Sequence, residues 1–245
     1  MGSWNNGVAA MQITTGIRRA VPDNPDGPYA NTAFGIAPAD SDGAAMNSLD
    51  LDADNSGTSE RKNLGVTTEL RFGRLRMENP VGSEKLALPI TMETQYWTGA
   101  GFARNAADGC TTVARQHFAL GSYTGNLNAC ETIVTPASVT FSGGLATINL
   151  TAPCTGAPCV GNDGSVLVTL NLATTPSGNR CDAVGGAGPA ATSAVFNYLL
   201  GRWDDGVDAD ANGNTNYDDN PRSRASFGLY GLPQPNNFIY FRENY

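Results

Sequence analysis

The strongest constraint on the fold is an alternation of apolar and polar residues over residues 86–97. One face carries Leu88, Ile90, Met92 and Tyr96, and the other carries Thr91, Glu93, Gln95 and Trp97. Alternation with a period of two predicts a β-strand with one buried face. Because Pro89 cannot donate to a strand ladder, we expect the start of this strand at a sheet edge or a bulge.

Further short apolar runs are separated by turn sequences. Strands are expected at residues 8–17, 66–77 with a bulge at Gly73, 139–141, 145–150, 166–172, 225–230 and 238–241. Residues 98–101 and 142–144 are glycine-containing hairpin turns, residues 22–47 form a long loop, and residues 195–203 form either a strand or a short helix. Since no segment shows sustained helical periodicity, the chain is predicted to be all-β. The expected architecture is an antiparallel β-sandwich, immunoglobulin-like or jelly-roll-like, with long loops.

The composition supports this class and excludes others. Charged residues make up 16% of the 245 residues, with 29 glycines and 14 prolines, which is typical of a loop-rich β protein. A net charge of −8 argues against nucleic-acid binding. No apolar run approaches the ~20 residues of a membrane-spanning helix, so no membrane insertion is expected. Two organisations stay open: one β domain over residues 1–245, or two sub-domains at 1–105 and 106–245.

Residues 208–219 have the ligand spacing of a twelve-residue EF-hand-type calcium loop. Oxygen-bearing side chains occupy positions 1, 3, 5, 7, 9 and 12 of this loop: Asp208, Asp210, Asn212, Asn214, Asn216 and Asp219. Gly213 falls at position 6, where such a loop turns sharply. The loop departs from the pattern at position 12, which is usually Glu, and the flanking residues do not predict a helix pair. The alternative is a surface turn rich in Asp and Asn.

A second acidic segment repeats part of this spacing. Its candidate ligands are Asp52, Asp54, Ser56, Thr58 and Glu60, and its twelfth position is Asn63, a weak ligand. The segment therefore predicts a second Ca²⁺ site, with a plain acidic turn as the alternative.

Five cysteines lie in loop-like sequence between residues 110 and 181. A zinc site is not expected, because there is no Cys-x-x-Cys motif and the chain has a single histidine. Loop cysteines fit an oxidising compartment. The pairs Cys110–Cys130 and Cys154–Cys159 would each close a short loop, with Cys181 left over; the alternative is that some of these are free thiols.

No sequence motif indicates catalysis. His117 has no neighbouring acid or nucleophile motif, and the chain has no Gly-x-Ser-x-Gly and no phosphate-binding loop. The sequence leaves open a pair of carboxylates that would catalyse glycoside hydrolysis. Calcium loops explain the same acidic residues better, because metal ligands must be deprotonated whereas a general acid must hold its proton. We therefore expect a protein that is not an enzyme.

Aromatic and basic residues suggest a binding surface. Trp97 and Tyr217 are the candidate ligand-binding residues, because aromatic faces can stack on sugars and Tyr217 lies within the predicted calcium loop. Tyr96 and Trp203 are instead expected in the core. Arg71, Arg74 and Arg76 could bind an anion, with pairing to Glu69, Glu78 or Glu93 on an outer sheet face as the favoured alternative.

Several motifs resemble the C-terminal domain of MshQ-like proteins, which accompany the mannose-sensitive haemagglutinin (MSHA) type IV pilus of Gram-negative bacteria. The resemblance rests on Asp26-Gly-Pro-Tyr29, Ile36-Ala-Pro38, Glu69-Leu-Arg-Phe-Gly-Arg-Leu-Arg76, Glu78-Asn79, Tyr96-Trp97-x-Gly-x-Gly-Phe102, Trp203-Asp204, Pro221-Arg-x-Arg-Ala-Ser-Phe-Gly-Leu-Tyr230 and Ile239-Tyr-x-Arg-Glu-x-Tyr245. It spans nearly the whole chain and implies export through the periplasm to the cell surface, with other domains of a longer protein or pilus subunits as partners. The family has one cysteine that matches Cys110, so the resemblance does not support the disulfide pairs.

Two functions follow as hypotheses. The first is an extracellular, calcium-stabilised β-sandwich that serves type IV pilus assembly or surface attachment. The second is a calcium-dependent, lectin-like module that binds a surface glycan. In either case the segment 208–219 is expected to act as a static clamp on the C-terminal strands, because no helix pair is predicted that could open around it.

Overall fold

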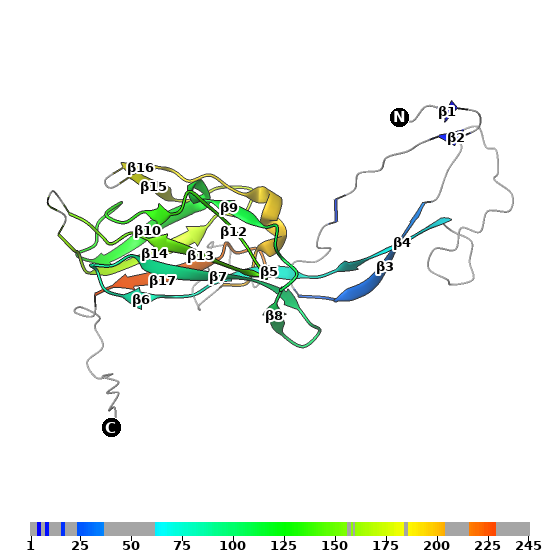
Figure 1. Ribbon diagram of the computed structural model, residues 1–245, viewed down its shortest axis with the longest axis horizontal. Coiled ribbons are helices and arrows are strands. Elements are labelled where there is room, and N and C mark those ends of the chain that lie inside the picture. The colour runs from blue at the N-terminus through cyan, green and yellow to red at the C-terminus, as the bar shows by residue number, and fades with distance from the viewer. Residues whose placement is uncertain are drawn as a thin grey trace, which may run out of the picture.

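Two stacked β-sheets form the body of the molecule in this computed structural model (Figure 1). The structure describes residues 4–5, 8–9, 16–17, 24–36, 62–155, 158, 160–183, 186–203 and 216–228. The all-β sandwich expected from the alternating runs is confirmed. The helices in this part of the chain are two 3₁₀ segments, η1 (Arg115–His117) and η2 (Ala194–Leu199), and neither is long enough to cross a membrane.

One sheet has six strands, in the order β16-β15-β10-β14-β17-β6. Their bounds are β16 (Gly186–Pro189), β15 (Asn179–Ala183), β10 (Phe118–Gly125), β14 (Gly164–Leu170), β17 (Arg222–Phe227) and β6 (Val81–Gly82). Neighbours pair antiparallel, except that β17 and β6 are parallel.

The other sheet has five strands, in the order β11-β13-β7-β5, with β8 on β7. Their bounds are β11 (Val134–Thr135), β13 (Leu145–Leu150), β7 (Leu88–Trp97), β5 (Gly73–Met77) and β8 (Phe102–Arg104). Strands from both sides of residue 105 lie in this sheet. The expected turn at 98–101 joins β7 to β8, where the Thr98 N–H donates to the Gly101 carbonyl at 2.9 Å.

Pro89 occupies an edge-like position, as its missing N–H requires. It faces Asn149 of β13, whereas β5 pairs with β7 only between Met92 and Tyr96. One side of the strand at Pro89 therefore has no β5 partner, and the proline removes no bond from that ladder.

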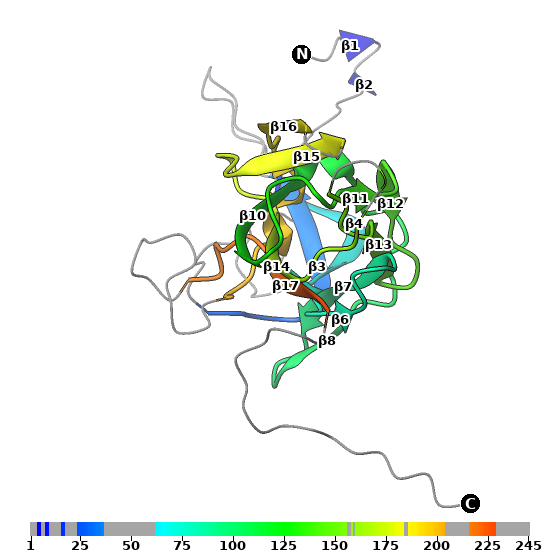
Figure 2. The same cartoon turned by 90° about the vertical axis from the view of Figure 1, so that its left-hand side faces the viewer.

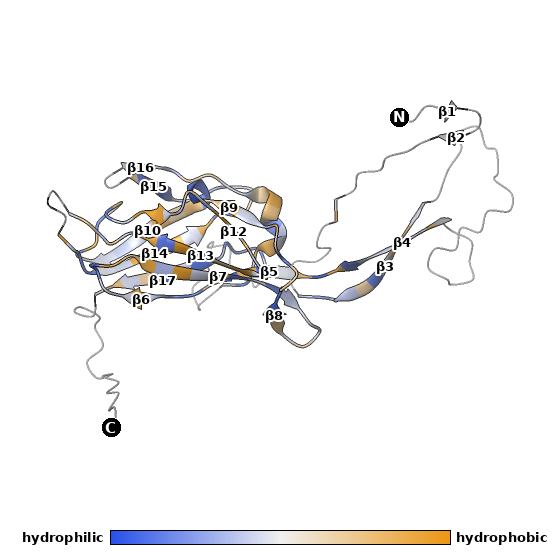
Figure 3. Ribbon diagram, in the orientation of Figure 1, coloured by the Kyte–Doolittle hydropathy of each residue, from blue (hydrophilic) through white to orange (hydrophobic). Residues whose placement is uncertain are grey.

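The core lies between the two sheets, where the inward faces of their strands meet. The alternation predicted for β7 is confirmed, because Leu88, Ile90 and Met92 are all buried. Figure 3 shows hydrophobic and hydrophilic residues alternating along the strands of the sandwich, and Figure 2 shows the strands from one end. The largest fully buried side chains come from several elements: Phe118, Phe141, Phe227, Leu75, Leu150 and Leu170.

The strand expected at residues 66–77 is in fact two strands in different sheets. Residues Lys62–Leu70 form β4, which pairs with β3 (Tyr29–Ile36) in an exposed two-stranded ribbon that projects from the sandwich (Figure 1). Arg71 and Phe72, which belong to neither strand, connect β4 to β5, and Phe72 is buried. The pairing partner changes at this point, because β4 pairs with β3 whereas β5 pairs with β7. Part of the loop expected at 22–47 is thus β3.

Other expectations are met only in part. The turn at 142–144 is present, but β12 (Ser138–Thr140) before it pairs with β9 (Thr112–Ala114) and not with β13. Residues 195–203 contain η2, the short-helix alternative. Near the start of the chain, β1 (Trp4–Asn5) pairs with β2 (Val8–Ala9), and Gly16 and Ile17 are not in a strand. The strand predicted at 238–241 lies outside the described residues.

Replacing Leu150 with alanine tests the packing of the core. Leu150 is 0% exposed, so Leu150→Ala is expected to lower the free energy of unfolding by about 2–5 kcal/mol through lost burial and a cavity. The matched control is Leu86→Ala, because Leu86 is 67% exposed and should change stability by less than about 0.5 kcal/mol. Urea denaturation measures both, and equal effects would contradict the assignment of the core.

Candidate functional site

Most of the predicted calcium ligands lie outside the described residues. This holds for Asp208, Asp210, Asn212 and Asn214, and for all five ligands of the second segment, Asp52, Asp54, Ser56, Thr58 and Glu60. Within the part of the chain that the structure describes, no three His, Cys, Asp or Glu residues gather as a metal site. Calcium binding therefore stays a prediction, and only Asn216 and Asp219 can be placed.

Asp219 joins the two ends of the segment that contains the predicted loop. Its side chain is 6% exposed, and its Oδ2 accepts the backbone N–H of Trp203 at 2.8 Å. The backbones of Gly201 and Asp219 also exchange two hydrogen bonds, of 3.0 and 2.9 Å. Residues 201–203 and 219 are therefore held side by side.

Asn220 attaches this junction to the six-stranded sheet. Its Oδ1 accepts the backbone N–H groups of Leu172 and Ala173 at 2.7 and 3.0 Å. These residues lie two and three positions after the end of β14, whose apolar side chains are in the core. The base of the segment is thus fixed to a buried strand of the sandwich.

An aromatic cluster lies beside this junction, formed by Phe72, Trp97, Phe102 and Tyr217. The ring centroid of Phe102 is 5.3 Å from that of Trp97 and 5.7 Å from that of Tyr217, and Phe72 is 5.3 Å from Tyr217. The structure therefore brings the two predicted ligand-binding residues, Trp97 and Tyr217, into one cluster. Both are partly buried.

Arg74 packs against this cluster. Its guanidinium carbon is 3.7 Å from the centroid of the Phe102 ring and 4.9 Å from that of Trp203, within the range of a cation–π contact. Its Nε donates to Oε1 of Gln95 at 2.8 Å. Burial lowers the pKa of Arg74, against opposing contributions from Tyr217 and Glu93. Phe102 was not predicted to belong to this cluster. Its position across a four-residue turn from Trp97 could have indicated that the two rings lie close together.

Arg71 is paired on the surface, as one of the sequence alternatives proposed. Its Nε donates to Glu69 at 2.7 Å, and its guanidinium lies 4.3 Å from the ring centroid of Tyr96. The hydrogen bond from Arg71 lowers the pKa of Glu69. Because both side chains are solvent-accessible, this pair contributes little to stability.

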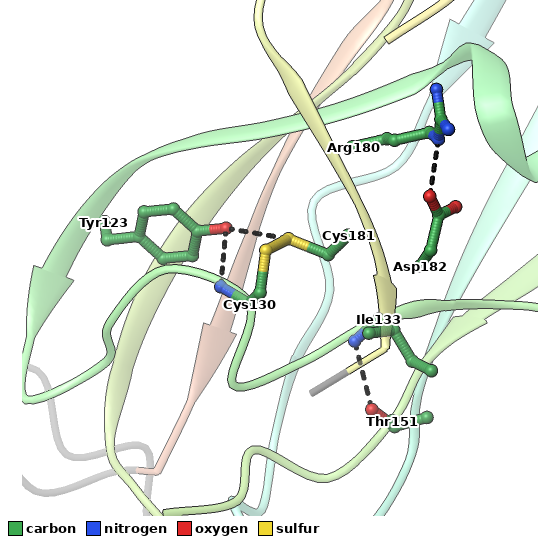
Figure 4. The surroundings of a disulfide bond; sticks show 7 residues. All are labelled: Tyr123, Cys130, Ile133, Thr151, Arg180, Cys181 and Asp182. Carbon is green, nitrogen blue, oxygen red and sulfur yellow. Dashed lines mark hydrogen bonds and ion pairs between the residues drawn. A yellow bond between two sulfur atoms is a disulfide. The ribbon is translucent and has the colours of Figure 1, made fainter. Parts of the chain in front are cut away.

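The disulfide between Cys130 and Cys181 overturns the predicted pair Cys110–Cys130 (Figure 4). Cys130 lies in the loop after β10, and Cys181 lies in β15, which pairs with β10, so sheet pairing brings their Cα atoms to 5.2 Å. The hydroxyl of Tyr123 accepts the backbone N–H of Cys130 at 3.3 Å, and burial raises the pKa of Tyr123. Proximity along the chain was therefore the wrong guide to the pairing.

The remaining cysteines differ in state. Cys110 is a free, exposed thiol, and its backbone N–H donates to Oδ1 of Asp108 at 3.3 Å. Cys154 is disulfide-bonded. Its predicted partner, Cys159, lies outside the described residues, so the pair Cys154–Cys159 stays a prediction.

His117 shows no catalytic arrangement in the described part of the chain. Its Nδ1 is buried without a hydrogen-bond partner there, and its Nε2 lies 3.3 Å from Nε2 of Gln116. Burial lowers the pKa of His117. This is the behaviour of a packed histidine and not of one held by a carboxylate.

The sequence of this sandwich matches a known family model. Residues 71–244 match the family model described as DUF6701, fourth domain, which covers both sheets and the predicted loop 208–219. The chain belongs to the DUF6701 family. The match to a fourth domain fits a DUF6701 protein in which this sandwich is one of several domains. No curated protein and no solved structure matches the chain.

The disulfide predicts a large stability difference between oxidised and reduced protein. Cys130 and Cys181 are 51 residues apart, and a crosslink over that span stabilises by about 4 kcal/mol if the main effect is on the unfolded chain. The double variant Cys130→Ala/Cys181→Ala should lose about that amount in urea denaturation. The control Cys110→Ser removes a free thiol and should change stability little; a double variant as stable as the parent would refute the crosslink.

Because burial lowers the pKa of His117, the free energy of unfolding is expected to depend on pH near neutrality. Its folded pKa lies below the unfolded value of about 6.5, so the unfolded chain binds the proton more readily. Its contribution is therefore fully present above pH ~7 and is lost as the pH falls through 6.5 toward the folded pKa. His117→Gln should flatten the stability profile between pH 5 and 7, because this is the chain's only histidine. An unchanged slope would contradict the assignment.

Proposed function

We propose that this DUF6701 domain is a non-enzymatic structural and attachment module of an exported, multi-domain surface protein, stabilised by calcium at residues 208–219. The observation that carries the proposal is the junction at Asp219. Asp219, the predicted position-12 ligand, is hydrogen-bonded to Gly201 and Trp203, which precede the calcium-spaced segment. An ion held there would connect the segment to a preformed base.

The proposed setting is the type IV pilus of the MSHA kind. It rests on the resemblance of the Glu69–Arg76 and C-terminal motifs to MshQ-like proteins, and membership of a multi-domain family is compatible with it. The disulfide Cys130–Cys181 supports export, since such bonds persist in oxidising compartments such as the periplasm and cell surface. Partners would be neighbouring domains of the same protein or pilus subunits.

The alternative function is calcium-dependent carbohydrate binding. It is supported by the aromatic cluster, in which Trp97 and Tyr217 flank Phe102 next to the predicted calcium segment. A sugar bound there would stack on an aromatic face and place hydroxyls near the ion. The partial burial of these rings favours the structural role over this alternative.

Calcium removal tests the main proposal. With Ca²⁺ at about 100 times its dissociation constant, EDTA should lower the melting temperature by about 5–10 °C. Asp208→Ala should melt like the EDTA-treated parent and respond little to added Ca²⁺. The matched control Asp182→Ala removes a carboxylate that is paired with Arg180 on the surface, and it should keep the calcium response.

Glycan binding with and without calcium distinguishes the structural role from the lectin-like role. A glycan array with and without EDTA should show no calcium-dependent binding if the ion is structural. Binding to one sugar class that EDTA abolishes would favour the lectin-like alternative. A melting temperature unaffected by EDTA would show that both predicted calcium segments are wrong.

A further inference from the structure

A groove rich in arginine lies where the chain crosses from one sheet to the other. Residues Glu78–Pro80 connect β5 of the five-stranded sheet to β6 of the six-stranded sheet, so β5 comes beside β17. Hydrogen bonds lock this crossing: the Arg224 N–H donates to Oδ1 of Asn79 at 2.8 Å, and the Ser226 N–H donates to the Pro80 carbonyl at 3.0 Å. The groove therefore has a rigid base made of paired strands.

The groove has a volume of about 620 Å³. Its described lining is Arg76, Met77, Glu78, Asn79, Leu167, Trp203, Arg222, Ser223 and Arg224. Three of these nine residues are arginines and one is acidic, in a chain with 15 Lys and Arg against 23 Asp and Glu. The described lining therefore has a net positive charge, opposite in sign to that of the whole molecule.

The positive charges of the three arginines are not neutralised by ion pairs with described residues. Arg222 donates to the Trp203 carbonyl at 3.2 Å and Arg224 donates to the Ser122 carbonyl at 2.7 Å, and both acceptors are neutral. Arg76 is exposed and makes no ion pair within the described part of the chain. Since a guanidinium has five N–H donors, each of the three keeps donors for a ligand.

We infer that this groove binds an extended acidic peptide segment of a partner protein, with carboxylates on alternate residues. Arg222 and Arg224 are two residues apart on one strand, so their Cα atoms are about 6.6–6.8 Å apart. An extended peptide repeats its side chains on one face at the same interval. Carboxylates at alternate positions of such a peptide therefore have the same spacing as the two arginines. Arg76 supplies a third donor group from β5.

The geometry favours a peptide over an anionic polysaccharide. The Trp203 ring is the aromatic surface of the groove, and it is already in contact with the Arg74 guanidinium and with Gly201, where an added Cβ would overlap the indole. The guanidinium covers one face of the ring, which leaves less aromatic surface for a sugar to stack on. A polymer with a carboxylate on every unit would also bring one against Glu78, whereas an alternating peptide can leave that position neutral.

The inference extends the proposed attachment role by naming the chemistry of a partner, and it does not depend on calcium. None of the groove residues is a predicted calcium ligand, although the Trp203 N–H donates to Asp219. The binding assay is therefore run both with Ca²⁺ and with EDTA. Peptide binding in either buffer supports the groove, and no binding in either buffer overturns it without bearing on the calcium test.

Titration of the full chain with a blocked peptide tests the inference. The probe is Asp-Leu-Asp-Ala-Asp, the sequence of residues 50–54, and its control is Asn-Leu-Asn-Ala-Asn. The acidic peptide should bind and the neutral one should not. Arg76→Gln should weaken binding by about tenfold, since a charge-assisted hydrogen bond is lost. It should leave the melting temperature unchanged, because Arg76 makes no ion pair with a described residue.

Matched variants separate the groove from general charge. Arg104→Gln removes the same charge from an exposed position outside the groove and should not alter binding. Arg222→Gln and Arg224→Gln should each weaken binding, with melting temperatures recorded because both lose a hydrogen bond to a carbonyl. Equal weakening by Arg104→Gln and Arg76→Gln would overturn the inference. So would binding of oligogalacturonate, sensitive to Arg76→Gln, without binding of the peptide.

Discussion

The packing of the two sheets against each other is the interaction on which the rest of the structure depends. Leu75, Ile90 and Met92 from one sheet and Val166, Val168 and Leu170 from the other form a layer that water does not reach. Removal of this apolar surface from water is the dominant favourable contribution to folding. In the part of the chain that the structure describes, the junction at Asp219, the aromatic cluster and the arginine groove are all attached to strands that this layer holds in place.

Three surface features of the sandwich are held in place by the strands of that layer. The junction of Trp203 with Asp219 sits on the end of β14 through Asn220, and the aromatic cluster sits on β5, β7 and β8. The arginine groove lies along β17 where the chain crosses between sheets. Because Trp203 takes part in the junction, contacts Arg74 and lines the groove, the three are physically connected.

Such an arrangement suits a module that binds by a preformed surface. The three groove arginines are on strands β5 and β17, so little ordering of the groove would be needed on binding. The exposed β3–β4 ribbon is different in kind. It presents Tyr29, Leu64 and Val66 to solvent, and both of its strands precede the region matched by the DUF6701 model.

The sequence by itself determined the class of fold and the faces of its main strands, because a period of two directly records which side chains point inward. It also determined the hairpin at residues 98–101 and the spacing of the predicted calcium segment. Only the tertiary structure decided which cysteines pair, that residues 66–77 divide between two sheets, and that Arg76 lines the same groove as Arg222 and Arg224. These depend on which distant strands become neighbours, and local patterns of residues do not encode that choice.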